Sequence, residues 1–281
     1  MSKMKVAMIQ MRVVEDKLRN IEIAAEYINE IVTENVDMVV LPEMFCCPYK
    51  TENFPIYGEP EGGPCYRMLS SIAKEHGIYL VAGSVPEKDE EGRVFNTSYV
   101  FDREGNKIGK HRKMHLFDIN VEGGQCFKES DTLSAGKDVT VFDTEFGKMG
   151  LAICYDFRFP ELSRLMVEAG AKVIVVPAAF NMTTGPAHWD ILFRTRALDN
   201  QVYTIGTAPA RDESSCYTSY GNSMAVSPWG DTICHMDEKE GYRIVELDLD
   251  YVDRVRNELP LLAHRRKDVY SLLKNNTIQN I

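Results

Sequence analysis

The chain has 281 residues, of which 44% are hydrophobic and 26% charged, and its formal net charge at pH 7 is -10. This length allows a single domain over residues 1–281, ending in a tail of about the last six residues. The negative charge argues against a protein that binds nucleic acid. No apolar run reaches the length of a membrane span, so we expect no membrane association either.

The cysteines number seven, and no CxxC pair occurs among them. Because the number is odd and the spacing gives no disulfide framework, we expect reduced thiols and a cytoplasmic protein. The apolar stretch Val6–Ile9 near the start of the sequence is too short for the core of a secretory signal, which agrees with that expectation.

Short apolar strands alternate with amphipathic helices along the chain, which predicts an α/β fold. The first half is predicted to contain strands at 4–11, 37–41, 78–85, 94–101 and 107–113, and helices at 16–34 and 64–76. A turn at Asp102–Gly105 connects the last two strands, and a long polar loop, 114–137, follows. The second half is predicted to contain a strand that ends at Cys154, helices at 160–169 and 187–200, and strands at 172–176, 202–208, 222–226, 232–236 and 243–247.

Two segments of the chain are similar to each other. Asp37–Phe45 and Lys172–Phe180 each contain a buried strand closed by proline, with a phenylalanine three residues later. Ala178 in the second segment replaces Glu43 of the first. We therefore predict two related α/β halves whose sheets pack face to face between helical layers. The alternative is a chance similarity between two buried strands.

Three predicted strands end near residues that could act together. Glu43 follows Val36–Pro42, Lys113 follows Lys107–Arg112, and Cys154 follows an apolar strand at a sharp corner. Active sites of α/β proteins usually lie at the carboxyl ends of strands, so we expect the three side chains to meet there. Cys154 would be the nucleophile, Glu43 the base and Lys113 the charge stabiliser.

Each of these residues also has an ordinary explanation. A cysteine at a strand end is often a small buried hydrophobic residue, a glutamate after proline could cap a helix, and a lysine could belong to a solvated face. A Cys–His dyad with His115 or His188 lacks a protease-like local signature. HExxH, Walker A, GxGxxG and GxSxG motifs are absent, and no histidine cluster accompanies Cys46 and Cys47, so we expect no metal site.

The blocks Leu41–Phe45, Lys110–Asp118 and Ile153–Glu161 together resemble the carbon–nitrogen hydrolases of the nitrilase superfamily, which carry a Glu–Lys–Cys triad in this order. The similarity covers about Lys3 to Tyr270. It implies a four-layer αββα sandwich of two mixed sheets with pseudo-twofold halves, a homodimer or higher homo-oligomer, and no cofactor. It also implies a second carboxylate after the lysine. Glu129 matches this position, with Glu122 as the weaker candidate and a solvated loop glutamate as the alternative.

Within the superfamily the chain looks most like the omega-amidases. The stretches that support this branch are His115–Ile119, Phe180–Trp189, Asp199–Tyr203, Pro209–Asp212 and Pro228–Asp231. Cys46, Cys47 and Asp190 depart from the expected pattern, and the two cysteines put the fit of the substrate in question. The resemblance implies that water hydrolyses the terminal amide of short dicarboxylic monoamides, such as 2-oxoglutaramate and 2-oxosuccinamate, through a thioester on Cys154.

Such a reaction needs further groups around the triad. The backbone N–H of Tyr155 is a candidate second donor to the oxyanion. The distal carboxylate of the substrate needs a cation, for which Arg158 and Arg194 are candidates, although Arg158 could instead pair with Glu161. Three more residues could line the pocket or pack in the core: Tyr49, Phe180 and Thr184.

The triad does not distinguish among electrophilic carbons attached to nitrogen. The alternative substrates are therefore an N-carbamoyl compound, a nitrile or another linear amide. A further alternative is a non-catalytic scaffold of the same fold, although such a protein has no need to keep all three triad residues.

Overall fold

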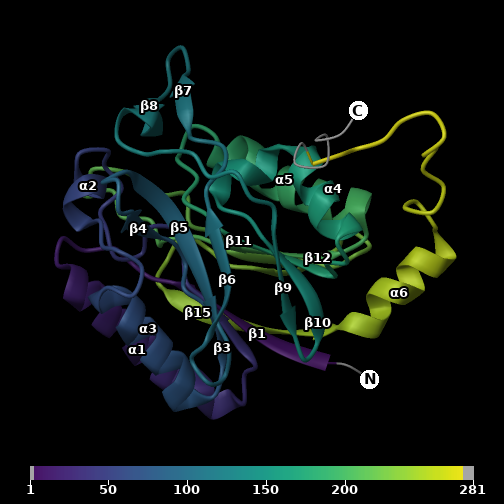
Figure 1. Cartoon of the computed structure of the whole chain (residues 1–281), viewed down its shortest axis with the longest axis horizontal. Helices are drawn as coiled ribbons and strands as arrows, with labels where there is room; N and C mark the ends of the chain where they lie inside the picture. Colours follow the sequence, from purple (N-terminus) through teal and green to yellow (C-terminus); the bar gives the residue numbers. More distant parts are fainter. Residues whose placement is uncertain (1–2, 275–281) are drawn as a thin grey trace.

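The computed structural model describes residues 3–274 (Figure 1). The predicted tail over the last six residues lies outside this range. Within the range, no helix is both long enough and apolar enough to span a membrane. All seven cysteines lie in the described part and carry free thiols, while the cellular compartment stays a prediction.

The first sheet is built mainly by the first half of the chain. Its strand order is β15-β1-β2-β3-β5-β4, with β6 also paired to β5. β1, β2 and β3 run parallel, whereas β15 is antiparallel to β1 and β5 is antiparallel to β3. The strands are β1 Lys3–Gln10, β2 Met38–Val40, β3 Tyr79–Val81, β4 Val85–Lys88, β5 Val94–Phe101, β6 Lys107–Arg112 and β15 Gly241–Asp248.

The second sheet repeats this arrangement. Its order is β14-β13-β12-β11-β10-β9, with β10, β11 and β12 parallel and antiparallel neighbours on both sides. β2 and β11, which carry the two similar segments, occupy the same central place in their sheets, as expected for two related halves. The strands are β9 Thr140–Thr144, β10 Gly147–Leu151, β11 Val173–Pro177, β12 Tyr203–Thr207, β13 Met224–Val226 and β14 Thr232–His235.

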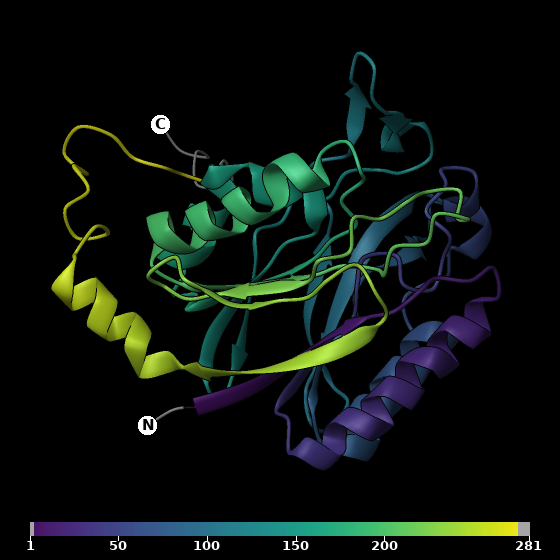
Figure 2. The same cartoon turned by 180° about the vertical axis from the view of Figure 1, so that it is seen from behind.

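Two pairs of helices cover the outer faces of the two sheets (Figure 2). α1 (Lys17–Ile31) and α3 (Pro64–His76) pack on the first sheet, and α4 (Pro160–Glu168) and α5 (Gly185–Asn200) pack on the second. Alternation along β1 explains the layering: Ala7 and Ile9 face α1 and α3, while Val6 and Met8 join the core between the sheets. The four-layer αββα sandwich predicted from the sequence is confirmed.

Helix ends in the first half follow local sequence signals. The carboxylate of Asp16 caps α1 by accepting hydrogen bonds from the N–H groups of Leu18 and Arg19 at 2.8 and 3.1 Å. α3 begins at Pro64 and ends at Gly77, which has a left-handed φ of 61°. The predicted helix over 64–76 has the bounds that the structure shows.

Several elements differ from the sequence-based expectation. The predicted strand 78–85 is two strands, β3 and β4, because Gly83 turns the chain with φ 48° where a Cβ would lie 2.2 Å from the carbonyl oxygen of Pro42. The predicted polar loop 114–137 contains a hairpin of β7 (Asp118–Asn120) and β8 (Cys126–Lys128), followed by a 3-10 helix, η2 (Glu129–Asp131). β9, the short helix α2 (Asn53–Tyr57) and α6 (Leu249–Glu258) were not predicted.

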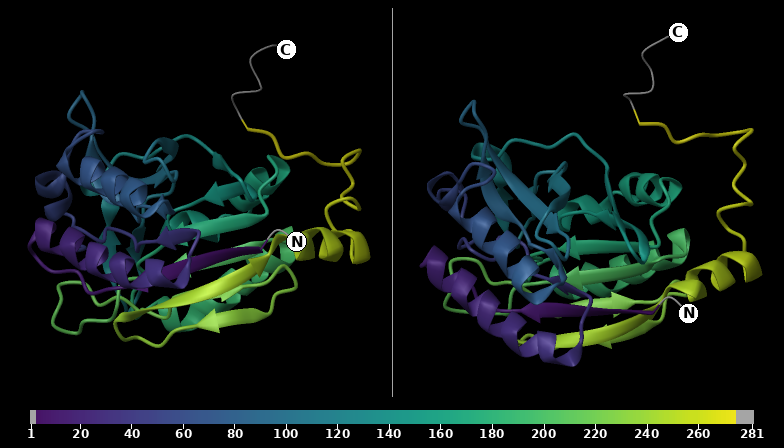
Figure 3. Two further views of the ribbon diagram at one scale, coloured as in Figure 1. Left: turned by 90° about the horizontal axis from the view of Figure 1, so that it is seen from below. Right: turned by 60° about the horizontal axis from the view of Figure 1, so that its bottom comes forward.

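The chain after α6 extends away from the main body before it returns toward α4 (Figure 3). An ion pair between Arg265 and Glu168 holds this segment to α4. Val269, Tyr270 and Leu273 on the segment are exposed. The last described part of the chain therefore carries apolar side chains that the other described residues leave exposed.

Candidate active site

The three strand ends singled out in the sequence meet in the structure. Glu43 lies three residues after β2, Lys113 directly follows β6, and Cys154 lies three residues after β10. The side chains of Glu43 and Lys113 are fully buried, and Cys154 is 5% exposed. The Nζ atom of Lys113 lies 3.0 Å from Oε1 of Glu43. Acidic and basic groups far apart in the sequence thus form one buried cluster.

Cys154 sits at a strained corner of the backbone. It begins a 3-10 helix, η3 (Cys154–Arg158), and has a φ of 47°, a left-handed conformation that is uncommon for a residue with a side chain. Burial raises the pKa of its thiol, as does Glu43, while Lys113 and a hydrogen bond with the backbone of Ala179 lower it. The net shift is upward, so the resting thiol is protonated and needs a base before it can attack.

Glu43 is placed to be that base. Its Oε1 atom accepts hydrogen bonds from Nζ of Lys113 at 3.0 Å and Nδ2 of Asn96 at 2.8 Å. The other oxygen, Oε2, is buried and has no hydrogen-bond partner in the described part of the chain, so it is available to the thiol or to a substrate. Burial raises the pKa of Glu43, Lys113 opposes the rise, and Glu129 adds to it. A carboxylate with a raised pKa is suited to exchange protons in both directions.

A second carboxylate completes the charge balance around Lys113. Oε1 of Glu129 lies 2.8 Å from Nζ of Lys113, and its Oε2 accepts a hydrogen bond from the N–H of Phe117 at 2.7 Å. Burial disfavours the charge on Lys113, but Glu129 and Glu43 outweigh burial and raise the pKa of the ammonium group. Glu122, the weaker candidate, is exposed in the β7–β8 turn. Of the two loop glutamates, the cluster therefore contains Glu129.

Tyr155, the candidate oxyanion donor, directly follows Cys154 in the chain. Tyr155 is the second residue of η3, and N–H groups in the first turn of a helix have no acceptor within that helix. The role of this N–H as an oxyanion donor stays a prediction.

One positioning group was missed by the sequence reasoning. Asp156 is fully buried, and its carboxylate accepts hydrogen bonds from Nε2 of His111 at 2.9 Å and Nδ1 of His115 at 2.7 Å. It also binds the N–H groups of His115 and Ile153. Burial opposes its charge, but the two histidines lower the pKa of Asp156 well below its usual range. The carboxylate thus ties the segment of Lys113 to the turn of Cys154. The only sequence signal was the pair of histidines that flank the lysine.

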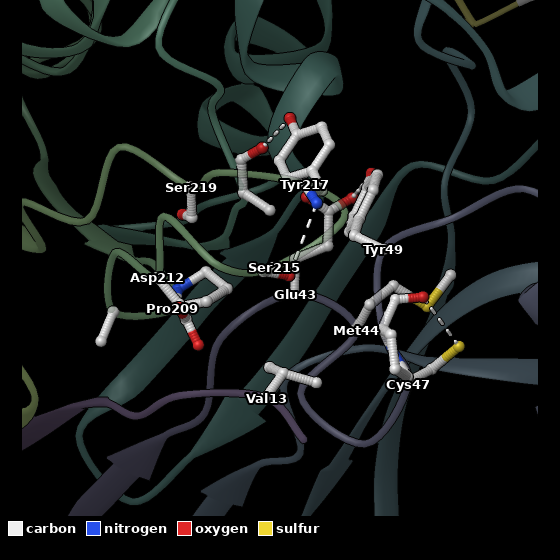
Figure 4. Close-up of a pocket in the computed structure, with 13 residues that line it drawn as sticks. Val13, Glu43, Met44, Cys47, Tyr49, Pro209, Asp212, Ser215, Tyr217 and Ser219 are labelled. Carbon is white, nitrogen blue, oxygen red and sulfur yellow. Dashed lines mark hydrogen bonds between the residues drawn. The ribbon is translucent and has the colours of Figure 1, made fainter. Parts of the chain in front are cut away.

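A small cavity of about 30 Å³ adjoins the cluster (Figure 4). Most of its wall comes from loops that follow β2 and β12. The lining residues are Val13, Glu43, Met44, Cys47, Pro48, Tyr49, Ala179, Pro209, Ala210, Asp212, Ser215, Tyr217 and Ser219. Cys47 is therefore part of the cavity wall, where burial raises the pKa of its thiol, whereas Cys46 packs with Cys65 in the core under α1 and α3.

Of the residues expected to bind substrate, Tyr49 is in the cavity wall, whereas Arg158, Phe180 and Thr184 are not among the lining residues. The guanidinium of Arg158 lies 4.6 Å from the ring centre of Phe180 and donates to Nδ1 of His188 at 3.0 Å. Thr184 precedes α5, where its N–H and hydroxyl both donate to Oδ1 of Asn181.

Arg194 is not brought to this cluster. Its side chain is exposed on α5, where it donates to the carbonyl of Gly230 and pairs with Asp190. Within residues 3–274, no group of three or more His, Cys, Asp or Glu side chains is arranged to hold a metal ion.

A family model described as carbon–nitrogen hydrolase matches residues 5–257 of the chain. The chain belongs to the carbon–nitrogen hydrolase family. Omega-amidase NIT2-A of Xenopus laevis is 45% identical over 272 residues, covering 97% of this chain and 98% of that protein. Omega-amidase NIT2 of Homo sapiens is 41% identical with the same coverage. This carbon–nitrogen hydrolase is therefore omega-amidase-like, as the sequence motifs indicated.

Solved structures agree with this assignment. Nit3 of Saccharomyces cerevisiae, a member of branch 10 of the nitrilase superfamily, superimposes on this carbon–nitrogen hydrolase with a TM-score of 0.87. It is 40% identical, and the match covers 94% of this chain and 97% of that chain. The NitFhit protein of C. elegans gives a TM-score of 0.88 at 33% identity, covering 96% of this chain and 66% of that one.

Proposed function

We propose that this carbon–nitrogen hydrolase releases ammonia from the terminal amide of short dicarboxylic monoamides such as 2-oxoglutaramate and 2-oxosuccinamate. The proposal is supported by the similarity to omega-amidases over nearly the whole chain. It is also supported by a buried nucleophile, base and cation at the strand ends. One observation on Arg158 carries the choice of a substrate with a free carboxylate.

Arg158 is a cation without an acidic partner. Among the described residues no carboxylate pairs with it, and its Nε is buried without a hydrogen-bond partner. Burial lowers the pKa of Arg158, while Cys154 and Tyr217 raise it. The guanidinium lies 5.7 Å from the ring centre of Tyr155, the residue that follows Cys154. Glu161, the partner considered from the sequence, is exposed in the first turn of α4. A partly buried cation without an acidic partner is stabilised when an anion joins it, and a substrate carboxylate would be that anion.

In the first half of the proposed reaction, the Cys154 sulfur attacks the amide carbon while its proton passes to Glu43. The new C–S bond leaves a tetrahedral oxyanion, which Lys113 and the N–H of Tyr155 stabilise. Glu43 then gives its proton to the amide nitrogen, the C–N bond breaks and ammonia leaves. The acyl group remains on Cys154 as a thioester.

In the second half, Glu43 is again a carboxylate and takes a proton from water, which attacks the thioester carbon. The C–S bond breaks, the thiolate recovers the proton from Glu43, and the dicarboxylate product leaves. Glu129 keeps Lys113 charged and in place through both halves, since the two atoms lie 2.8 Å apart. A single carboxylate can serve as base, acid and base again, because burial raises the pKa of Glu43 above its usual range.

Ammonia release tests this function directly. We expect 2-oxoglutaramate to be hydrolysed faster than glutamine, a simple nitrile or an N-carbamoyl amino acid at equal concentration. Faster turnover of the carbamoyl compound or the nitrile would reassign the substrate. A folded protein that turns over none of the four would support a non-catalytic scaffold.

Replacing Arg158 by methionine should lower kcat/KM for 2-oxoglutaramate by about 100-fold, mainly through KM, because a charge-assisted hydrogen bond to the carboxylate is lost. Propionamide, which has no distal carboxylate, should be hydrolysed at nearly the wild-type rate. Arg194→Met is the matched control, since that exposed side chain pairs with Asp190 instead. An equal loss with both amides would mean that Arg158 supports the turn of Cys154 rather than binding the carboxylate.

We also propose that the chain forms a homodimer through the outer face of α5. On this helix Ile191 is 64% exposed and Leu198 is 46% exposed. Trp229 is 47% exposed, and its neighbour Gly230 accepts a hydrogen bond from Arg194 of the same helix. Exposed apolar side chains on one helix and beside it are typical of an interface between subunits.

A further inference from the structure

Tyr49 contacts three of the four ionisable groups of the buried cluster. Its hydroxyl oxygen lies 3.0 Å from Oε1 of Glu43 (Figure 4). The same oxygen lies 2.5 Å from Oε1 of Glu129 and 3.4 Å from Nζ of Lys113. The ring is held by aromatic neighbours, with ring centres 5.4 Å from Phe54 and 4.7 Å from Tyr217. A pocket-lining role does not explain why the hydroxyl bridges two carboxylates.

A phenol has one proton, so it can donate to one of these two oxygens at a time. Lys113 also donates to both, and Asn96 donates to Glu43. The proposed reaction removes and restores the negative charge on Glu43 twice in each cycle, whereas Glu129 has no proton to exchange. The better acceptor for the Tyr49 proton therefore changes as the reaction proceeds.

We propose, resting on the proposed function of Glu43 as the base, that Tyr49 is a positioning residue whose O–H donates to Glu43 when Glu43 is ionised and turns to Glu129 when Glu43 is protonated. In the ionised state the phenol stabilises the carboxylate that must accept the thiol proton. After Glu43 has accepted the thiol proton, the phenol hydrogen bond turns from Glu43 to Glu129. Glu43 is then free to protonate the leaving nitrogen. The step moves no proton between residues and needs only rotation about the C–O bond.

The sign of the effect on Glu43 follows from the contacts. A hydrogen bond donated to an ionised carboxylate favours the charged form and lowers its pKa, whereas a nearby like charge raises the pKa. The titratable groups that face Glu43 and Tyr49 are Lys113, Glu129, Cys154 and Tyr217, and Asp212 lies across the cavity. Loss of the phenol therefore raises the pKa of Glu43 in the free enzyme, and loss of the Glu129 charge lowers it.

The test compares the pH dependence of two single variants with that of the wild type. Tyr49→Phe keeps the aromatic packing and should move the acidic limb of the kcat/KM profile up by about 1 pH unit, with kcat falling about tenfold and KM little changed. Glu129→Gln should move the same limb down. Tyr203→Phe is the control, because it removes a buried phenol that donates to the carbonyl of Asp248 away from the site.

A second readout does not depend on which amide is hydrolysed. The rate at which iodoacetamide alkylates Cys154, followed by peptide mass spectrometry at each pH, reports the same ionisation because Glu43 must take the thiol proton. The Tyr49→Phe profile should shift upward in this assay as well. Superimposable alkylation profiles for wild type and Tyr49→Phe would overturn the role of Tyr49. If the pH profile of alkylation shifts as expected but no amide releases ammonia, the proposed function is rejected and the role of Tyr49 toward Glu43 stands.

Discussion

Replacing Cys154 by alanine is expected to lower kcat/KM for amide hydrolysis by about 10⁴-fold or more, because the sulfur is the atom that would form the thioester. Without it, Glu43 and Lys113 can only assist water, which is a poor nucleophile toward an amide. The substitution removes one buried atom and should leave the fold intact. The measurement is ammonia release by purified variant and wild type at matched concentration.

Cys65→Ala is the matched control for this loss. Cys65 is also a buried thiol, 3% exposed, but it packs with Cys46 in the core under α1 and α3. We expect this variant to keep nearly full activity and to lose a little stability from the small cavity. Activity of Cys154→Ala within tenfold of the wild type would mean that another group is the nucleophile.

Replacing Lys113 by methionine is expected to abolish activity and also to change how stability depends on pH. Lys113 neutralises Glu43 and Glu129, which are both fully buried and lie 3.0 and 2.8 Å from its Nζ. Removing one partner of a buried ion pair typically costs about 3–5 kcal/mol. In the variant, two carboxylates share a buried site without a cation, so their pair titrates with pKa values raised well above the usual range for glutamate.

The direction of the pH effect follows from this rise. A carboxylate whose pKa is higher in the folded state than in the unfolded state favours folding below the unfolded value of about 4.3, and this contribution is lost as pH rises through the folded value. Lys113→Met should therefore be destabilised more at pH 8 than at pH 5, relative to wild type at each pH. Urea unfolding followed by tryptophan fluorescence measures the difference, since Trp189 is buried.

Lys110→Met controls for the loss of any paired lysine. Lys110 also contacts two carboxylates, Glu61 and Glu87, but its side chain is 25% exposed, so water compensates for much of the loss. Its destabilisation should be about 1 kcal/mol or less and nearly independent of pH between 5 and 8. The account of Lys113 is contradicted if Lys113→Met loses the same stability at pH 5 as at pH 8.

The placement of the triad could be predicted from the sequence because strand ends are local features. Glu43 follows a run of Met38–Val40 closed by proline, and Lys113 follows a turn and a strand with clear bounds. β2 and β6 run in the same direction in the first sheet, because two antiparallel pairings separate β3 from β6, so Glu43 and Lys113 leave the same edge. Face-to-face packing of the second sheet then brings Cys154 to that edge. The role of Glu129 rested on the resemblance to the family, since nothing in the polar loop itself indicates that η2 turns this side chain inward.

Other features depend on contacts between distant segments and left weak signals. Asp156 binds donors from the segment 111–115 as well as the nearby Ile153, and its own neighbours in sequence give no sign of the distant contacts. Arg158 was weighed against an ion pair with Glu161 because they are close in sequence, yet Arg158 lies in η3 and Glu161 in α4. α6 was missed although Leu249, Val252 and Val255 have helical spacing.

The central claim is that Cys154 carries the acyl group of the substrate. The most direct test mixes the protein with a slowly hydrolysed amide, quenches the reaction with acid and measures the intact mass and the peptide masses. The account predicts a protein heavier by one acyl group, with the added mass on the peptide that contains Cys154 and none in Cys154→Ala. Ammonia release by the wild type without any adduct on that peptide, or an adduct on another residue, would contradict it.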